Sequence, residues 1–177
     1  MTKKIITLSG KQFCGKDTVA KILLSKLPSF VRVGLADAIK LEYSRRTGLS
    51  VEEIEANKSL YRPDLIALGT EGRNIDKDYW LKSILKIDHD VIVPDVRLPH
   101  EIEVFKEHGA FCIRVEASSV ARSKRGVLTK EDDYTEIALD NYKNWNYVLS
   151  NDSDYNFLVL NSKDLLSAIN IFFMTNF

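Results

Sequence analysis

The residue pattern with the clearest chemistry is a glycine-bounded turn near the amino terminus. Gly10-Lys11-Gln12-Phe13-Cys14-Gly15-Lys16 matches G-x-x-x-x-G-K between a predicted strand and a predicted helix. Glycines let the backbone wrap closely around a polyphosphate, and a helix N-terminus directs N–H groups and a positive dipole end at it. Lys16 would add a mobile charge for the β- and γ-phosphates. The spacing predicts a phosphate loop, whose binding residues would be Gly10, Lys11, Phe13, Cys14, Gly15, Lys16, Asp17 and Thr18.

The position after the lysine departs from the usual pattern, in which a Ser or Thr hydroxyl holds Mg²⁺. Asp17 stands there and Thr18 follows, so either side chain could hold the metal, and the sequence leaves both open. Asp95 ends a short, nearly all-apolar stretch that reads as a buried strand. An acidic residue at such a strand end can organise a magnesium–water shell beside a phosphate loop. Asp17, Thr18 and Asp95 are therefore the predicted metal ligands.

Basic residues recur in three separate segments, as an enzyme with two phosphorylated substrates requires. Arg97 closely follows Asp95, and Arg122, Lys124 and Arg125 lie in a polar stretch. The third group falls in the helical region between the second and third predicted strands; it comprises Lys40, Arg45, Arg46, Arg62 and Arg73. For each of these residues taken singly, a solvated helix face is the alternative explanation.

Length and composition limit the remaining possibilities. The chain has 177 residues, 25 Lys+Arg against 25 Asp+Glu, and 45% hydrophobic residues, which suits one folded domain and excludes a disordered chain. Net neutrality argues against bulk binding to nucleic acid or to a membrane surface. No signal peptide and no apolar run of membrane-spanning length is expected. Two distant cysteines and three histidines without ligand spacing argue against a disulfide scaffold or a zinc site and favour a reduced, cytoplasmic protein.

Apolar patterns alternate between strand and helix along the chain. Strands are expected near 4–9, 30–35, 90–95, 111–115 and 147–149. Helices are expected between them. Asp37 and Asp76 are the predicted N-caps, and Ser50 with Glu53 is a predicted capping box. Helices are also expected to start at Pro63 and Pro99, and a closing helix is expected over 162–173. This order predicts a three-layer α/β fold with a mostly parallel sheet, of the type found in P-loop nucleoside-triphosphate hydrolases. We expect a single domain over 1–177. Within it, a helical region at 38–88 would bind the molecule that accepts a phosphoryl group, and a polar segment at 118–133 would form a lid.

A switch GTPase is a different class of protein with a phosphate loop, and the sequence argues against it. Such a protein should carry D-x-x-G after a strand and N-K-x-D for guanine. Asp95 is followed by Val96-Arg97-Leu98, without the glycine, and Asn161-Ser162-Lys163-Asp164 has its lysine one place late.

Several ordered segments resemble the phage-type deoxynucleoside monophosphate kinases. The resemblance lies in 35–40, in 68–73 leading to Asp78-Tyr79-Trp80, and in 93–101. The variant loop Gly15-Lys16-Asp17-Thr18 fits that family too, as do Thr135-Glu136 and Asn151-Asp152.

The animal-type phosphomevalonate kinases are also similar. They share the Gly15-Lys16-Asp17 loop, a lid like Ser119–Gly126 with two arginines, and a stretch like Leu139-Asp140-Asn141. Of the two families, segments 68–73 and 94–101 favour the deoxynucleoside monophosphate kinases.

The resemblance implies a kinase of the nucleoside monophosphate type that moves the γ-phosphoryl group of ATP, with Mg²⁺, to a small phosphomonoester, here a (deoxy)nucleoside monophosphate. A phosphomevalonate kinase is the alternative, and a non-catalytic nucleotide-binding module is the alternative of another class. The catalytic residues would be Lys16, Arg97, Arg122 and Arg125, and the acceptor-site residues Asp37, Lys40 and Arg73. We expect a monomer or a homodimer.

Overall fold

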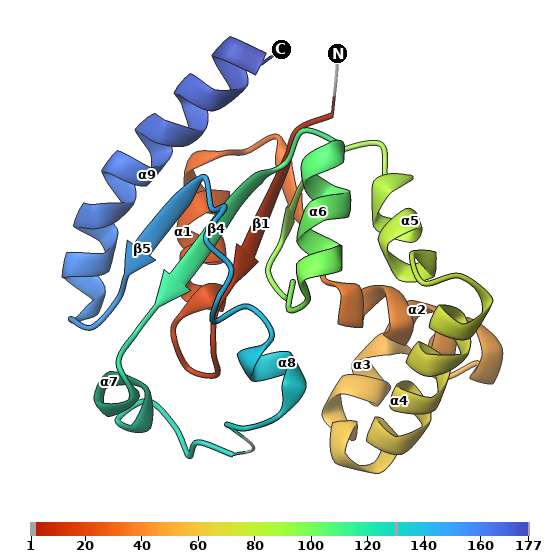
Figure 1. The fold of residues 1–177 in the computed structure, drawn as a ribbon. Coiled ribbons are helices and arrows are strands. Elements are labelled where there is room, and N and C mark those ends of the chain that lie inside the picture. Colours follow the sequence, from red (N-terminus) through yellow and green to blue (C-terminus); the bar gives the residue numbers. More distant parts are fainter. Residues whose placement is uncertain (1–2, 130, 177) are drawn as a thin grey trace. The chain divides into compact units, whose positions relative to one another are not determined.

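The computed structural model describes residues 3–129 and 131–176. The chain forms two compact units (Figure 1). One unit lies within Met1–Arg32 and His89–Phe177, and the other is Val33–Asp88. The second unit includes the helical region expected at 38–88, while the assignment of the whole chain to one kinase domain stays a prediction.

The first unit is built on a five-stranded parallel sheet, as predicted. Its strands are β1 (Ile5–Ser9), β2 (Phe30–Arg32), β3 (Asp90–Val93), β4 (Phe111–Glu116) and β5 (Tyr147–Ser150). Their order is β2-β3-β1-β4-β5, with Thr7 beside Val93 and Ser9 beside Arg114. Because every pair is parallel, the loops after β1, β3, β4 and β5 leave the same edge of the sheet.

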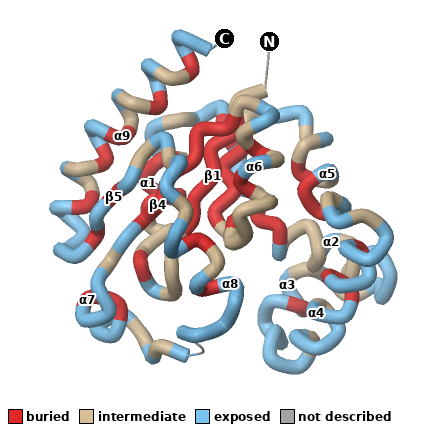
Figure 2. The backbone as a smooth tube through the Cα atoms, viewed as in Figure 1, coloured by how far each residue is buried: buried red, intermediate tan, exposed pale blue. Residues whose placement is uncertain are grey.

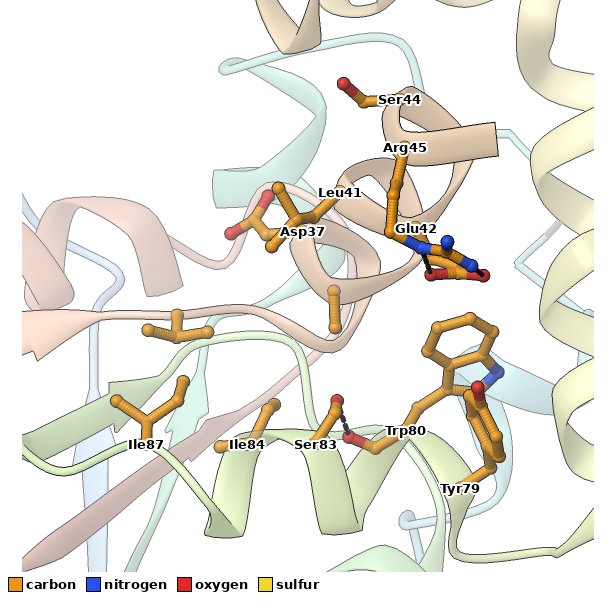
Figure 3. A pocket seen from close by; sticks show the side chains of 12 residues that line it. Asp37, Leu41, Glu42, Ser44, Arg45, Tyr79, Trp80, Ser83, Ile84 and Ile87 are labelled. Carbon is orange, nitrogen blue, oxygen red and sulfur yellow. Dashed lines mark hydrogen bonds and ion pairs between the residues drawn. The ribbon is translucent and has the colours of Figure 1, made fainter. Parts of the chain in front are cut away.

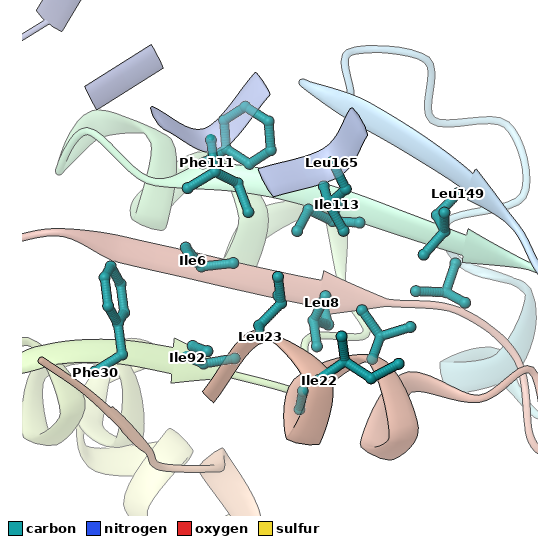
Figure 4. Close-up of a cluster of buried hydrophobic side chains, with 14 of the residues drawn as sticks. Ile6, Leu8, Ile22, Leu23, Phe30, Ile92, Phe111, Ile113, Leu149 and Leu165 are labelled. Atoms are coloured by element: carbon teal, nitrogen blue, oxygen red, sulfur yellow. The ribbon is translucent and has the colours of Figure 1, made fainter. Parts of the chain in front are cut away.

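Helices cover both faces of this sheet. Every residue of β1 is buried, as expected for a central strand of a parallel sheet (Figure 2). Ile6 and Leu8 pack on one face with α1 (Lys16–Lys26) and α9 (Tyr155–Asn176) (Figure 4). On the other face α6 (Pro99–Glu107) contacts β1 and β4, and its residues Ile102 and Phe105 are fully buried. The short helices α7 (Ser119–Ser123) and α8 (Tyr134–Ile137) follow β4.

Helix α9 is longer than the 162–173 predicted from the apolar pattern. It begins at Tyr155, where the Asp154 carboxylate accepts a hydrogen bond from the Phe157 N–H at 2.9 Å. By length and hydropathy α9 could also cross a membrane. In this structure its buried apolar residues join the sheet core; they are Leu158, Leu165, Ile169 and Phe173.

The unit Val33–Asp88 consists of α2 (Leu35–Thr47), α3 (Val51–Ala56), α4 (Lys58–Ile75) and α5 (Tyr79–Leu85). The predicted capping box of α3 is confirmed, because the Glu53 N–H donates to Ser50 Oγ at 3.1 Å and the Ser50 N–H to Glu53 Oε2 at 2.8 Å. The prediction for Asp37 is wrong: Gly34 is the N-cap, and the third helical residue Asp37 accepts the Gly34 N–H at 2.9 Å.

Two other predicted helix boundaries in this unit are wrong. Pro63 lies inside α4, which begins at Lys58 because the Leu60 and Tyr61 N–H groups donate to the Asn57 carbonyl. Asp76 ends α4, and Asp78 is the N-cap of α5. The Asp76 side chain nevertheless accepts the Asp78 N–H at 2.9 Å, so it shapes the turn between the two helices.

The ion pairs of Glu42 give this unit a testable pH dependence. Hydrogen bonds from Arg45 and Arg46 lower the pKa of Glu42 from 4.5 to about 2. A depressed folded-state pKa contributes stability above pH 4.5 that is lost as the pH falls towards 2. We expect Glu42→Gln to reduce the acid-induced loss of unfolding free energy, measured by urea denaturation from about pH 7 to about pH 3. Glu52→Gln, at an exposed position of α3, is the control and should lose as much unfolding free energy on acidification as the wild type does. Equal losses in the wild type, Glu42→Gln and Glu52→Gln would contradict the prediction.

Candidate active site

The turn between β1 and α1 has the backbone of a phosphate loop. Gly10, Phe13 and Gly15 have φ angles of 152°, 58° and 100°. A Cβ on Gly10 would lie 2.3 Å from the Val115 carbonyl oxygen, and one on Gly15 would lie 2.3 Å from Asn151 Nδ2. The two glycines are therefore required both by backbone conformation and by the closeness of β4 and of the segment after β5.

Gly10→Ala tests how tightly this turn is enclosed. The added methyl group would meet a backbone carbonyl and the Cys14 sulfur, and φ would stay positive. We expect a loss of about 3 kcal/mol or more in unfolding free energy, measured by chemical denaturation. Gly48→Ala is the matched control, because φ is 77° there and a Cβ would meet nothing within 4 Å, so only about 1–2 kcal/mol should be lost. Equal losses at the two positions would contradict the enclosure of Gly10.

Lys16 is the first residue of α1, and its side chain lies over the turn. Its Nζ donates to the Gly10 carbonyl at 2.5 Å and the Lys11 carbonyl at 3.0 Å. Burial lowers the pKa of Lys16; Arg97 lowers it further, whereas Glu136 raises it. The ammonium is thus a partly desolvated cation held by loop carbonyls, where it interacts strongly with anions.

Side chains from the segments after β4 and β5 bind consecutive carbonyls of the loop. Arg122 Nη1 donates to the Gln12 carbonyl at 3.4 Å and Arg125 Nη1 to the Phe13 carbonyl at 3.3 Å. Asn151 Nδ2 donates to the Cys14 carbonyl at 2.8 Å. These donors neutralise the oxygen side of the loop, which favours an anion on its amide side.

Arg122 and Arg125 were predicted to contact the transferring phosphoryl group from a lid. In the structure Arg122 is buried and pairs with Glu131, at 2.6 Å, besides its contact with the loop. Arg125 also donates to the Asn151 carbonyl at 2.7 Å. It borders a cavity of about 210 Å³ that Gly15, Thr18 and Tyr155 also line. Both arginines do meet the phosphate loop, but through its backbone.

Arg97 reaches the loop through a carboxylate that the sequence had not singled out for chemistry. The Glu136 side chain on α8 is only 4% exposed. Its Oε1 accepts from Arg97 Nη1 at 2.5 Å and its Oε2 from the Gln12 N–H at 2.8 Å. Glu136 is 124 residues from Gln12 in the chain, so no local spacing could have indicated this contact.

A second carboxylate, Asp140, holds the predicted loop residue Lys11. Lys11 Nζ donates to Asp140 Oδ2 at 2.7 Å, and Arg114 Nη2 donates to Asp140 Oδ1 at 3.2 Å. Arg114 is buried at the end region of β4. Lys11 is therefore tied to the sheet edge by a charge pair that sequence analysis missed.

The predicted metal ligands all provide oxygen atoms near the loop. Asp95 lies two residues after β3, at the sheet edge from which the loop leaves. Thr18 lines the cavity beside Arg125. The Asp17 carboxylate is 75% exposed and pairs with Arg32 at 3.4 Å. Within residues 3–129 and 131–176, no cluster of three or more His, Cys, Asp or Glu side chains is suited to a metal ion.

The helical unit Val33–Asp88 contains its own cavity of about 670 Å³ between α2 and α5 (Figure 3). Leu41, Trp80 and Ile84 give it a mainly apolar wall, and Asp37 and Arg45 add charged groups.

The three residues predicted for the acceptor site do not gather around this cavity. Asp37 lines it. Lys40 instead pairs with Glu55 at 2.6 Å and with Asp37 at 3.3 Å, and Arg73 Nη2 donates to Thr70 Oγ1 at 3.4 Å.

Solved structures share this fold. Shikimate kinase from Aquifex aeolicus vf5 aligns with a TM-score of 0.53 and 19% identity, over 93% of this chain and 94% of that one. The TT1252 protein from Thermus thermophilus aligns with a TM-score of 0.58 and 18% identity, over 95% and 98% of the two chains. These likenesses confirm the predicted α/β fold of P-loop kinases.

Sequence comparison decides between the two resemblances. A phosphomevalonate kinase from Drosophila melanogaster is 28% identical over 169 residues, covering 85% of this chain and 89% of that protein. The phosphomevalonate kinase family profile matches residues 8–111, more than half of the chain. These matches support the animal-type resemblance, and the preference for phage-type nucleotide kinases gains no support from them. The chain therefore belongs to the phosphomevalonate kinase family.

Proposed function

We propose that this protein transfers the γ-phosphoryl group of ATP to the phosphate of mevalonate 5-phosphate, giving mevalonate 5-diphosphate and ADP. The observation that carries the proposal is the phosphate loop with Lys16 beside Arg97 in a member of the phosphomevalonate kinase family. A loop that only bound nucleotide would not need a second cation beside Lys16, whereas transfer between two phosphates does.

The donor site in this proposal combines the loop and the cavity next to it. The amides of residues 10–18 and the Lys16 ammonium would bind the triphosphate. The purine would enter the cavity of about 210 Å³ bordered by Arg125 and Tyr155. A planar guanidinium can stack on a base while its N–H groups hold backbone carbonyls, as those of Arg125 do here.

Charge neutralisation and alignment are the main chemical tasks. The acceptor is a phosphate monoester that is largely ionised near pH 7, so the reaction needs no strong general base. Two anions that repel must be brought in line, and charge on the transferring group must be neutralised. We assign Lys16 and Arg97 to neutralising the charge on the transferring phosphoryl group. We assign Arg122 and Arg125 to holding the loop in its phosphate-binding shape, in accord with their contacts to its carbonyls.

Oxygen ligands near the loop suit Mg²⁺, which enzymes of this kind bind through one or two protein oxygens together with substrate phosphates. Asp95, with Asp17 or Thr18, would hold the ion. When bound, it would neutralise phosphate charge.

The acceptor's carbon skeleton is assigned to the cavity of the helical unit. Mevalonate 5-phosphate carries a branched aliphatic chain with a hydroxyl and a carboxylate. Leu41, Trp80 and Ile84 offer apolar surface for the chain. The Arg45 guanidinium suits the carboxylate and the Asp37 carboxylate suits the hydroxyl.

An ADP-release assay with Mg²⁺ and ATP tests the proposal against a panel of acceptors. The panel contains mevalonate 5-phosphate, dGMP, dTMP and other nucleoside monophosphates. We expect ADP release with mevalonate 5-phosphate only. Release with nucleotides only would return the acceptor to the phage-type resemblance, and ATP binding without turnover on any acceptor would indicate a non-catalytic module; either result would overturn the proposal.

A further inference from the structure

We propose that Glu136 is an internal competitor of the substrate phosphate: its carboxylate binds donors of the phosphate site and must leave them when a polyphosphate binds. This inference rests on the donor site of the proposed function and is independent of the identity of the acceptor.

The geometry of the carboxylate is that of a bound oxyanion. Its two oxygens accept separately from the Gln12 N–H, at 2.8 Å, and from Arg97 Nη1, at 2.5 Å. A loop amide and a guanidinium together are the donors that proteins use for phosphate groups. Both hydrogen bonds that the Glu136 side chain makes among the described residues therefore go to groups that a phosphate would use.

The charges around Glu136 support the same conclusion. The Glu136 side chain is 4% exposed. It lies close enough to Lys16 to raise the pKa of that lysine, whereas Arg97 lowers the same pKa. One carboxylate thus compensates two partly desolvated cations. A polyphosphate brings more negative charge to the same cations, so it outcompetes the carboxylate but loses part of its affinity in doing so.

The local structure lets the carboxylate move without disturbing the sheet. Glu136 belongs to α8, a helix of only four residues. Its neighbours Tyr134 and Ile137 are 67% and 43% exposed, so Glu136 is directed inward while they face solvent. A rotamer change or a small shift of this short turn would release both donors.

Calorimetric titration with inorganic tripolyphosphate tests the inference, because this probe reports the phosphate site alone. We expect Glu136→Gln to lower the dissociation constant for tripolyphosphate about five- to tenfold, since the amide keeps the shape but not the charge. Glu103→Gln is the matched control. It removes a carboxylate from α6 of the same unit, where Glu103 accepts from the Tyr142 hydroxyl at 2.6 Å, and should leave the dissociation constant unchanged.

Unchanged or weaker binding by Glu136→Gln would overturn the proposal, because the carboxylate would then support the site rather than compete for it. If Glu136→Gln does not fold, Glu136→Asp takes its place. Its shorter side chain cannot span both donors, so tighter binding than wild type is again expected, and weaker binding again contradicts competition. Wild-type protein that binds neither tripolyphosphate nor ATP would overturn the donor site itself, whereas binding without phosphorylation of mevalonate 5-phosphate would overturn only the proposed acceptor.

Discussion

Lys16→Ala is expected to lower kcat for phosphoryl transfer about a hundred- to thousandfold while the protein remains folded. The ammonium is the cation that the loop presents to the β- and γ-phosphates, and partial burial strengthens its interaction with the charge that moves during transfer. The change removes the hydrogen bonds of Lys16 Nζ to the Gly10 and Lys11 carbonyls and its longer contact with the Cys14 sulfur. Alanine is a good first residue for α1, so the helix should remain. Steady-state kinetics and circular dichroism would measure the two effects.

Lys21→Ala is the matched control for this change. Lys21 lies on the same helix, carries the same charge and is exposed. It should keep wild-type kcat. Near-wild-type turnover by Lys16→Ala would refute the active site, and equal losses in the two variants would indicate a general effect of charge on α1 rather than a role at the loop.

The sheet and the phosphate loop could be predicted because their signals are local. A strand buried on both faces reads as a nearly continuous apolar run. In β1 only Thr7 interrupts that run between Ile5 and Leu8, and both neighbouring strands are parallel to it. Glycine spacing marks the turn because nearby backbone and side chains exclude a Cβ at Gly10 and Gly15. Both features depend on residues that are close together in the sequence.

Helix starts were harder to predict because several polar residues near a start can serve as its cap. Asp37 has the residue type of an N-cap, but it acts from the third helical position by accepting the Gly34 N–H. Similarly, Asp76 accepts the Asp78 N–H from the turn before α5. In each case the sequence identified the right side chain and misplaced the boundary by a few residues.

The groups that complete the loop come from far along the chain, and their roles could not be inferred from spacing. Glu136 and Asp140 reach the loop from the segment after α7. Arg122 and Arg125 were assigned to catalysis from a lid, and nothing in the sequence indicated that their guanidinium groups also donate to carbonyls of the loop.

The segment 94–101, which favoured a nucleotide acceptor, has a structural explanation that does not involve the acceptor. The Glu101 carboxylate accepts the backbone N–H groups of Arg97, at 2.8 Å, and Leu98, at 3.0 Å, and Pro99 begins α6. The motif therefore builds the turn from β3 to α6 and positions Arg97. A kinase that needs an arginine at this point can use the turn whatever phosphate it phosphorylates, so these contacts say nothing about the acceptor.

Arg97→Met is expected to lower kcat about a hundredfold with a much smaller change in KM for ATP, because its cation is assigned to charge that develops in the transition state. Arg97→Lys should recover part of kcat, since it restores the charge but not the planar fork. Arg62→Met, at an exposed position of α4, is the control and should keep wild-type kcat. A rise in KM for ATP without a fall in kcat would place Arg97 in nucleotide binding instead.

The pairing of Arg97 with Glu136 provides a way to separate catalysis from stability. Arg97→Met leaves a buried carboxylate with the Gln12 N–H but without its guanidinium, so the melting temperature should fall. Combining Arg97→Met with Glu136→Gln removes the unpaired charge and should restore much of the melting temperature. It should not restore kcat, because no cation has been returned to the transferring phosphoryl group. Recovery of both properties in the double variant would mean that Arg97 serves only to compensate Glu136, and the catalytic assignment would be wrong.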